Sequence, residues 1–306
     1  MKMRVVVLMG GWSAEREVSL VTGNAVADAL MDRGYEVTRI DADRNVPRLL
    51  ASIDPRPDVV FNALHGRFGE DGCIQGVLDI LGLPYTHSGV LASALAMHKP
   101  TAKRLFAEVG IPCPDGEVVG LSEVLDGAVM APPYVIKPVN EGSTVGVHII
   151  RDGEVLSDLD HEDWSYRDEV LVERYIPGRE LSVAVIGDKA LGVIEIRPLS
   201  GFYDYEAKYS DGKARHMMPA PVVPEVYQEA LRLALLAHRT LGCRGVSRAD
   251  LRYDDTEGEP GCLYMLEVNT QPGMTPLSLV PEIAAHSGVG FADLVSLMVE
   301  NAQCDA

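Results

Sequence analysis

The stretch VVVLMGGWSAEREVS (residues 5–19) sets the class of fold. Five apolar residues lead into Gly10-Gly11, and Val18, Val21 and Ala25 then recur at helical spacing. This pattern predicts a buried strand, a tight turn and a helix. Many nucleotide-binding folds hold a phosphate at such a turn. However, the chain contains neither G-x-x-x-x-G-K-[ST] nor G-x-G-x-x-G, so neither a P-loop nor a standard dinucleotide site is predicted.

A carboxylate near the start of this helix argues against a phosphate ligand. Ser13 is predicted to be the N-cap, which places Glu15 in the first helical turn. There Glu15 would repel a phosphate but could hold an ammonium group. The alternative is that Glu15 only complements the positive end of the helix dipole.

Outward from this stretch, strand and helix patterns alternate over about the first 90 residues. Residues 36–40 and 59–62 read as two further strands, and this βαβ rhythm predicts a parallel sheet with helices on its faces. The loop HGRFGEDG (65–72) follows the third strand at its carboxyl end, where such sheets bind ligands. We therefore expect His65 to contact a substrate.

Composition excludes several classes of function. The chain has 306 residues, which favours two or three domains, and a formal net charge of −18, which argues against nucleic-acid and anionic-membrane partners. No stretch approaches the roughly 20 apolar residues of a membrane span. The five cysteines are scattered without a C-x-x-C pair, so reduced thiols in a cytoplasmic protein are expected.

The pattern changes near residues 95–112, which predicts a domain boundary. Short strands are expected next, at 134–137, 147–150 and 170–175, followed by a hairpin of strands 181–186 and 190–196. A long amphipathic helix (226–241), two strands (245–253 and 262–269) and a final helix (291–298) complete the pattern. Residues 200–210 fit no regular period and are interpreted as a lid or binding loop.

Two motifs point to anion and metal chemistry. In KPVNEGSTVG (137–146), Lys137 ends a strand and the glycine turn could aim N–H groups at a phosphate, although Lys-Pro before a glycine turn also occurs in plain hairpins. In VSRADL (246–251) and LEVNT (266–270), alternate residues carry the charges. If the two strands pair, Asp250, Glu267 and Asn269 converge with Arg248 on one surface. Such oxygen ligands suit Mg²⁺, and the alternative is a salt bridge of Arg248 with either acid.

Together these pieces resemble the D-alanine–D-alanine ligases of the ATP-grasp superfamily. The matching stretches follow the family's order along the chain: GGWSAEREVS (10–19), ALHGRFGEDG (63–72), the region of Lys99, KPVNEGSTVGV (137–147), FYDYEAKY (202–209), SRADL (247–251) and LEVNTQPGMTPLSLVP (266–281).

The resemblance implies a fold of α/β and α+β parts. A Rossmann-like N-terminal substrate domain (1–95) would precede a two-domain ATP-grasp fold, formed by a central subdomain (96–180) and a C-terminal catalytic subdomain (181–306). It also implies ATP-dependent ligation of two D-alanines through an acyl phosphate, for peptidoglycan precursor synthesis. ATP and two Mg²⁺ ions are implied cofactors, with Mn²⁺ as a substitute and a monovalent cation as an addition. A homodimer is implied as well.

The site residues that the resemblance implies fall into four groups. ATP would contact Lys99, Lys137, Ser143, Glu173, Tyr175, Ile176, Glu180 and Lys208. Mg²⁺ would contact Asp250, Glu267 and Asn269. Substrate would contact Glu15, His65, Arg248, Gly273, Ser278 and Leu279. Catalytic roles would fall to Glu15, Ser143, Tyr209, Arg248, Gly273 and Ser278, with Arg248 and Gly273 stabilising the oxyanion.

Tyr209 points to an amine as the second substrate, because relatives that make D-alanyl-D-lactate lack this tyrosine. Three residues depart from the family pattern: His98 replaces the usual Asp before Lys99, Pro100 follows it, and Leu277 replaces a frequent His or Ser. The alternatives are another ATP-grasp ligase with a different second substrate, of the D-serine or D-lactate type, and a catalytically silent ATP-binding module.

Overall fold

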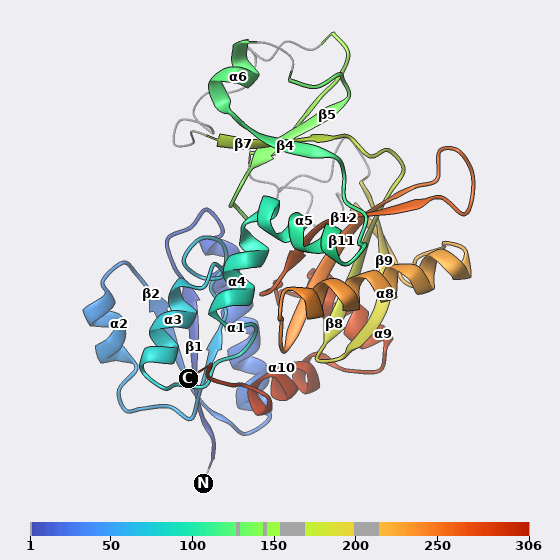
Figure 1. Ribbon diagram of the computed structural model, residues 1–306. Coiled ribbons are helices and arrows are strands. Elements are labelled where there is room, and N and C mark those ends of the chain that lie inside the picture. Colours follow the sequence, from blue (N-terminus) through green and yellow to red (C-terminus); the bar gives the residue numbers. More distant parts are fainter. Residues whose placement is uncertain (1, 127–128, 143–145, 154–168, 199–213, 306) are drawn as a thin grey trace.

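The computed structural model describes residues 2–126, 129–142, 146–153, 169–198 and 214–305. Three sheets organise this part of the chain, and Figure 1 shows them as a blue N-terminal part, a green part above it and a yellow-to-red C-terminal part. Each sheet lies within one of the three proposed domain segments, except that β8 begins two residues early, at Arg179.

The N-terminal sheet is parallel, with the strand order β2-β1-β3. All residues of β1 after Arg4 are buried, because helices and the rest of the protein cover both faces of this sheet. Its elements are β1 (Arg4–Gly10), α1 (Arg16–Asp32), β2 (Glu36–Ala42), α2 (Val46–Ser52), β3 (Val59–Asn62), α3 (Cys73–Ile80) and α4 (Val90–Met97). The predicted βαβ arrangement is confirmed.

The predicted N-cap of the first helix is wrong by two residues. Helix α1 begins at Arg16, so Glu15 occupies the cap position. The Ser13 hydroxyl instead accepts a hydrogen bond from the Glu15 N–H at 3.2 Å and donates to the His65 carbonyl at 2.7 Å. Ser13 therefore ties the first loop to the loop after β3, a contact between distant segments that local sequence does not reveal.

The second sheet is antiparallel, with the order β4-β7-β5-β6, and has its own small core around Tyr134, Ile136 and Val172. Its elements are α5 (Lys99–Glu108), which leads into it, β4 (Gly116–Gly120), α6 (Leu121–Asp126), β5 (Tyr134–Pro138), β6 (His148–Ile150) and β7 (Glu169–Arg174). The three strands predicted in this region are confirmed to within two residues.

The third sheet is antiparallel, with the order β10-β9-β8-β11-β12. Its elements are β8 (Arg179–Ile186), β9 (Lys189–Pro198), β10 (Ala214–Met217), α8 (Pro224–Thr240), β11 (Val246–Asp254), β12 (Cys262–Asn269), α9 (Leu279–His286) and α10 (Phe291–Glu300). Alternate residues of β8 face opposite cores: Val183 packs towards α8, whereas Ala184 packs towards α9. The predicted hairpin, helices and strand pair are confirmed.

The first and third sheets share one hydrophobic core. A single buried cluster joins Val7 and Phe61 of the N-terminal sheet to Ile194 of β9 and to Leu294 of α10. Figure 1 shows α10 lying beside the N-terminal part, near the C-terminus. The chain end is held there because Tyr85 and Gln303 form a backbone bridge. The N-terminal sheet is therefore fixed relative to the C-terminal sheet.

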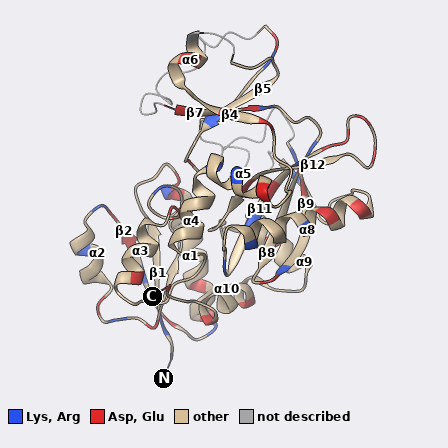
Figure 2. Cartoon of the chain, viewed as in Figure 1, with Lys and Arg blue, Asp and Glu red and all other residues tan. Residues whose placement is uncertain are grey.

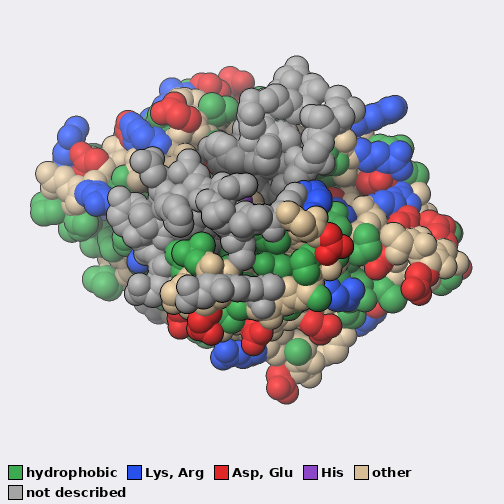
Figure 3. Space-filling view, turned by 90° about the horizontal axis from the view of Figure 1, so that it is seen from above, with side chains coloured by type: hydrophobic (Ala, Val, Ile, Leu, Met, Phe, Trp, Pro, Cys, Tyr) green, Lys and Arg blue, Asp and Glu red, His purple; other side chains and the backbone are tan. Residues whose placement is uncertain are grey.

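Among the described residues, no single helix is long and apolar enough to cross a membrane, and only the pair α9 and α10, bent by 103°, meets the length and composition when taken together. Charged residues of both signs are spread over the helices and loops (Figure 2), and their side chains over the part of the face seen from above that is not grey (Figure 3).

Candidate active site

A cleft of about 760 Å³ lies where the second and third sheets meet. Residues from α5, β5, β7, β8, β11 and β12 form its walls: Lys99, Pro114, Val135, Lys137, Val147, Glu173, Arg174, Tyr175, Ile176, Glu180, Asp250, Arg252, Leu266 and Glu267. All of the described residues predicted to contact ATP are in this set, as are the predicted metal ligands Asp250 and Glu267.

The predicted pairing of the last two strands is confirmed. In the β11–β12 ladder Arg248 lies opposite Asn269, and Asp250 lies opposite Glu267. The register shifts just after this point, so Leu266 has no partner residue on β11. Such a bulge re-aims side chains, which explains how the consecutive residues Leu266 and Glu267 both face the cleft.

Each of the two acids in this ladder has a cationic partner, and for Asp250 it is Arg248, the salt bridge given above as the alternative to a metal site. The Asp250 carboxylate accepts from Arg248 Nε at 2.8 Å and Nη2 at 2.7 Å, and from the Ser182 hydroxyl at 2.6 Å. The Glu267 carboxylate lies 3.3 Å from Lys99 Nζ. The side chains of Asp250 and Lys99 are largely buried, so these contacts offset the cost of desolvating the charges.

The donor set Asp250, Glu267 and Asn269 fits a magnesium ion. Two opposed carboxylates and a neighbouring amide supply hard oxygen atoms, and Mg²⁺ in phosphate sites takes its remaining ligands from phosphates and water. Within the described ranges, no group of three or more His, Cys, Asp and Glu side chains could hold a metal by itself. That finding does not concern this set, since it contains only two such residues.

The departures at His98 and Pro100 do not displace Lys99 from the cleft. His98 caps α5, because its Nδ1 accepts from the Thr101 N–H at 3.3 Å, and Pro100 occupies the first turn, where no N–H is needed. Lys99 is 6% exposed and its Nζ donates to the Glu141 carbonyl at 2.5 Å. Leu277, the third departure, is 45% exposed.

Two lysines pair with one buried carboxylate in the cleft wall. Lys137 and Lys103 each form an ion pair with Glu173, one at each carboxylate oxygen. Burial alone would raise the pKa of Glu173, but the two ammonium groups hold it below its ordinary value. Sequence reasoning missed Lys103, although its position four residues after Lys99, on the same face of one helix, was a usable signal.

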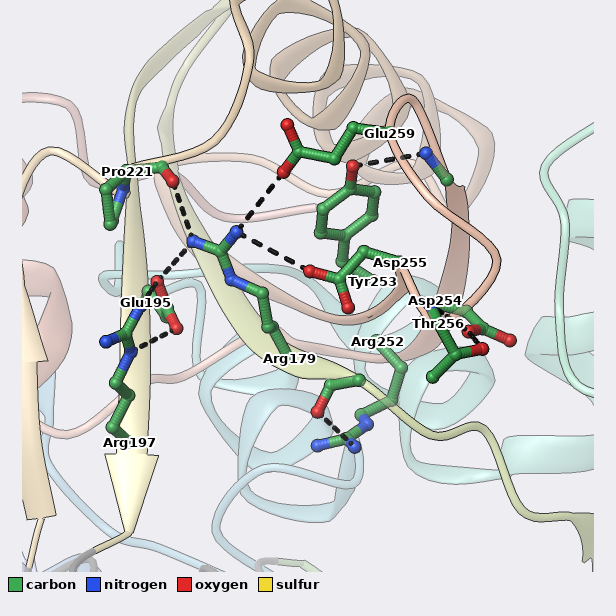
Figure 4. A network of polar contacts seen from close by, with 12 residues as sticks. Arg179, Glu195, Arg197, Pro221, Arg252, Tyr253, Asp254, Asp255, Thr256 and Glu259 are labelled. Carbon is green, nitrogen blue, oxygen red and sulfur yellow. Dashed lines mark hydrogen bonds and ion pairs between the residues drawn. The ribbon is translucent and has the colours of Figure 1, made fainter.

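The segment that joins β7 to β8 is fixed by arginines. Arg252 donates to the carbonyls of Ile176 at 3.1 Å and Gly178 at 2.9 Å, and lies 3.8 Å from the Glu180 carboxylate. Behind it, Arg179 contacts Glu195, Asp255, Glu259 and the Pro221 carbonyl (Figure 4). Tyr175, Ile176 and Glu180 are thus held at the cleft.

A second cavity adjoins the first. Lys99 and Glu267 line both, and the second is completed by Glu70, Ala96, Met97, Glu141, Gly142, Val268, Asn269 and Thr270. Two glycines here leave room for the Glu15 carboxylate: a Cβ added to Gly142 would stand 2.8 Å from Glu15 Oε2, and one added to Gly66 would stand 3.0 Å from it. Glu15 is 6% exposed.

Glu70 was not singled out from the sequence, yet it lies beside Glu15. Its carboxylate accepts from the Gly66 N–H at 2.5 Å. Burial first, and then the negative charge of Glu15, raise the pKa of Glu70 well above its ordinary value. Of the two, Glu70 lines the second cavity, and two neighbouring carboxyl groups can hold a cation such as an ammonium group.

His65 is buried and uncharged. Its Nε2 lies 3.1 Å from the Thr22 hydroxyl. Burial, and secondly the Arg248 guanidinium, lower the pKa of His65 to about 4. This places His65 near Arg248, but the predicted contact with substrate stays a prediction.

Gly273 and Ser278 lie on the loop that enters α9, and Leu279 is the first residue of that helix. A Cβ added to Gly273 would stand 3.0 Å from the Ser278 hydroxyl, and that hydroxyl accepts from the Thr275 N–H at 2.9 Å. Ser278 is the residue before the first turn of α9, whose N–H groups favour a carboxylate. The Leu279 side chain, however, packs in the shared core, so any substrate contact of Leu279 falls to its backbone.

Gln271, also missed from the sequence, docks this loop on the N-terminal sheet. Its side chain accepts from the Asn62 amide at 2.8 Å and donates to the Leu64 carbonyl. These partners lie more than 200 positions away in sequence, so local pattern holds no signal for them. Ser143, Lys208 and Tyr209 lie outside the described residues, so their predicted roles stay predictions.

This architecture, with a cleft between two antiparallel sheets and the opposed carboxylates of Asp250 and Glu267 in its lining, defines an ATP-grasp enzyme. Sequence models described as D-ala D-ala ligase N-terminus and C-terminus match residues 43–88 and 107–300. The chain belongs to the D-alanine–D-alanine ligase family, as the sequence resemblance had indicated.

Relatives and solved structures agree with this assignment. The chain is 60% identical over 308 residues to a D-alanine–D-alanine ligase of Paramagnetospirillum magneticum, and 58% identical over 307 residues to one of Rhodospirillum rubrum; both alignments cover 100% of each chain. The D-alanine–D-alanine ligase of Bacillus anthracis, in a crystal structure complexed with ATP, is 32% identical with a TM-score of 0.81, over 98% of this chain and 96% of that one.

Proposed function

We propose that this protein uses ATP to join two D-alanine molecules into D-alanyl-D-alanine, for peptidoglycan precursor synthesis. The observation that carries the proposal is that the two cavities adjoin each other, with Lys99 and Glu267 lining both. A nucleotide in the larger cavity would direct its terminal phosphate towards these residues, and an amino acid in the smaller one would meet it there.

The reaction requires the γ-phosphate of ATP and the carboxylate of the first D-alanine to meet. A carboxylate is a poor electrophile until one oxygen becomes a leaving group. A carboxylate oxygen of the first D-alanine bonds to the γ-phosphorus while the bond to ADP breaks. The amine of the second D-alanine then attacks the acyl carbon, phosphate leaves with that oxygen, and the amine loses a proton. The protein's contribution is positioning and charge neutralisation.

The position of each residue in the structure suggests its role in the proposed ligation. Lys99 and Lys137 would contact phosphates, and Glu15 would bind the ammonium of the first D-alanine beside Glu70. Arg248 and the Gly273 N–H would stabilise the oxyanion, and Ser278 at the start of α9 would receive the second carboxylate. Asp250, Glu267 and Asn269 would hold Mg²⁺ or Mn²⁺, which supplies charge stabilisation on the phosphates when bound.

The remaining parts of the proposal rest on the family resemblance. They are the contacts of Glu173, Tyr175, Ile176 and Glu180 with adenosine, the roles of Ser143, Lys208 and Tyr209, a monovalent cation, a homodimer and a cytoplasmic location.

The test is ADP release by the purified protein with D-alanine, D-serine, D-lactate or L-alanine, with the product identified by mass spectrometry. D-alanine, with no other amino or hydroxy acid present, should stimulate ADP release and give the dipeptide. Glu267→Gln should abolish turnover, whereas Glu229→Gln, a carboxylate on the exposed face of α8 paired with Arg232, should not. ADP release that needs D-lactate or D-serine would favour the alternative acceptor.

A further inference from the structure

Three charged side chains lie together in the wall of the nucleotide cleft. Lys103 comes from α5, Lys137 from β5 and Glu173 from β7, and their side chains are 11%, 9% and 3% exposed. Lys103 is bound at Oε1 of Glu173 and Lys137 at Oε2. Gly116 on β4 leaves space for this arrangement, since a Cβ there would stand 2.6 Å from Glu173 Cγ.

The charges of this triad do not cancel. Two ammonium groups face one carboxylate, so the triad carries one net positive charge. If Lys103 were absent, Glu173 would neutralise Lys137, and their attraction would be strong because water is largely excluded from both. The other lysine of the cleft, Lys99, is already 3.3 Å from the Glu267 carboxylate. The surplus charge of the triad therefore matters for binding an anion here.

Only two of the three side chains reach the ligand space. Lys137 and Glu173 line the cleft, whereas Lys103 is not among the lining residues. Lys103 can thus act on a nucleotide only through Glu173. Lys137 and Val135 lie on the same face of β5, and Glu173 lies opposite Val135 on β7. The carboxylate is therefore a diagonal neighbour of Lys137 on this surface.

We propose that Lys103 is a positioning residue of the nucleotide site: it neutralises Glu173, so that Lys137 keeps its full positive charge for the phosphates. This inference rests on the proposed ATP-dependent function. It predicts that Lys103 contributes to phosphate binding without touching the nucleotide, and that its contribution depends on the charge of Glu173.

The test is a double-mutant cycle on nucleotide binding without D-alanine. Affinities for ADP and adenosine are measured by competition against a fluorescent ADP analogue. Lys103→Met should weaken ADP binding on the order of 10- to 100-fold, with adenosine affinity changed less than about 3-fold, because adenosine has no phosphate. Because Glu173 is itself proposed to contact adenosine, the adenosine arm is read as a ratio: Lys103→Met should weaken ADP binding by a clearly larger factor than adenosine binding. In the Glu173→Gln background, the same Lys103 substitution should weaken ADP binding less than about 3-fold.

Two controls keep the test decisive. Lys103→Arg retains the charge and should keep ADP affinity near that of the unaltered protein. The unfolding midpoint and circular dichroism of each variant show whether the fold is retained. If Lys103→Met weakens adenosine as much as ADP, or costs ADP binding equally in both backgrounds, Lys103 has a structural role and the proposal is overturned.

Failure of this proposal is separable from failure of the proposed function. The double-mutant cycle measures nucleotide affinity alone, whereas the proposed function is tested by measuring dipeptide formation. A protein that binds ADP with the expected cycle but makes no dipeptide from D-alanine would retain the triad's role and lose the assigned reaction.

Discussion

Arg248 binds Asp250 through two parallel hydrogen bonds, from Nε at 2.8 Å and Nη2 at 2.7 Å, between residues two apart on one strand. The pair occupies the end of β11 that faces Glu267 and Asn269. It fixes the guanidinium plane next to the acids proposed to hold the metal, so its geometry should matter more than its charge.

Arg248→Lys should lower kcat for D-alanine-dependent ADP release on the order of 10²- to 10³-fold, because lysine cannot make the paired contact or present a planar donor to an oxyanion. Arg232→Lys is the matched control, since Arg232 makes a similar two-point contact with Glu229 on the exposed face of α8. Steady-state kinetics of both variants check this. Equal effects of the two substitutions would contradict the role of Arg248.

Gly142→Ala should raise the KM for the first D-alanine far more than the Kd for ADP. The added methyl group would stand 2.8 Å from Glu15 Oε2 and 3.4 Å from Glu70 Oε1, in the space assigned to the ammonium. Gly76→Ala in α3 is the control, because the nearest atom to its Cβ would be an ordinary 3.8 Å away. An unchanged KM for D-alanine would show that this space does not hold the substrate.

Acid should destabilise the fold through three buried histidines. Burial is the largest cause that lowers the pKa of His65 and His238 to about 4, and that of His87 to about 3. Below an unfolded pKa of about 6.5, the unfolded chain binds protons that the folded one does not. Stability should therefore fall as pH drops from about 6.5 towards 4.

Each histidine would cost up to about 3 kcal/mol in this window, at about 1.4 kcal/mol per pKa unit. Urea unfolding at several pH values measures the slope. His238→Gln should flatten it, whereas His286→Gln, at an exposed position on α9, should leave it as it was. If the His238→Gln variant shows the same slope as the unaltered protein, His238 does not contribute to the acid destabilisation.

ADP affinity should fall as pH rises through about 8. Burial, and secondly the Lys137 ammonium, lower the pKa of Lys103 to about 8, and above it the triad loses its surplus charge. Lys137 from β5, Glu173 from β7 and Cys113 after α5 face Lys103. Burial raises the pKa of the Cys113 thiol, which keeps it neutral here. Lys103→Arg should remove this pH dependence; if it persists, another group titrates.

Much of the fold was predictable because periodicity is local. The β3 bounds, the β11–β12 pair and the helix after residue 224 all follow from apolar spacing and turn residues. The prediction that Arg248 and Asp250 face Glu267 and Asn269 required only the alternation of side chains along a strand and the assumption that the two strands pair.

The missed residues all depend on contacts between distant segments. Gln271 binds Asn62 and Leu64 across domains, and Lys103 meets Glu173 from another element. The N-cap at Ser13 failed for the same reason, because its hydroxyl is directed to His65. Glu70 and Gln271 lay within motifs already quoted, but the role of Glu70 emerges only from its burial beside Glu15.

The most direct test of the central claim follows one oxygen atom. D-alanine labelled with ¹⁸O in both carboxylate oxygens is supplied with unlabelled ATP, and the inorganic phosphate is analysed by mass spectrometry. The account predicts one ¹⁸O in each phosphate for each dipeptide formed, because a carboxylate oxygen of the first D-alanine leaves with the phosphoryl group. Unlabelled phosphate accompanying dipeptide formation would contradict the acyl phosphate route.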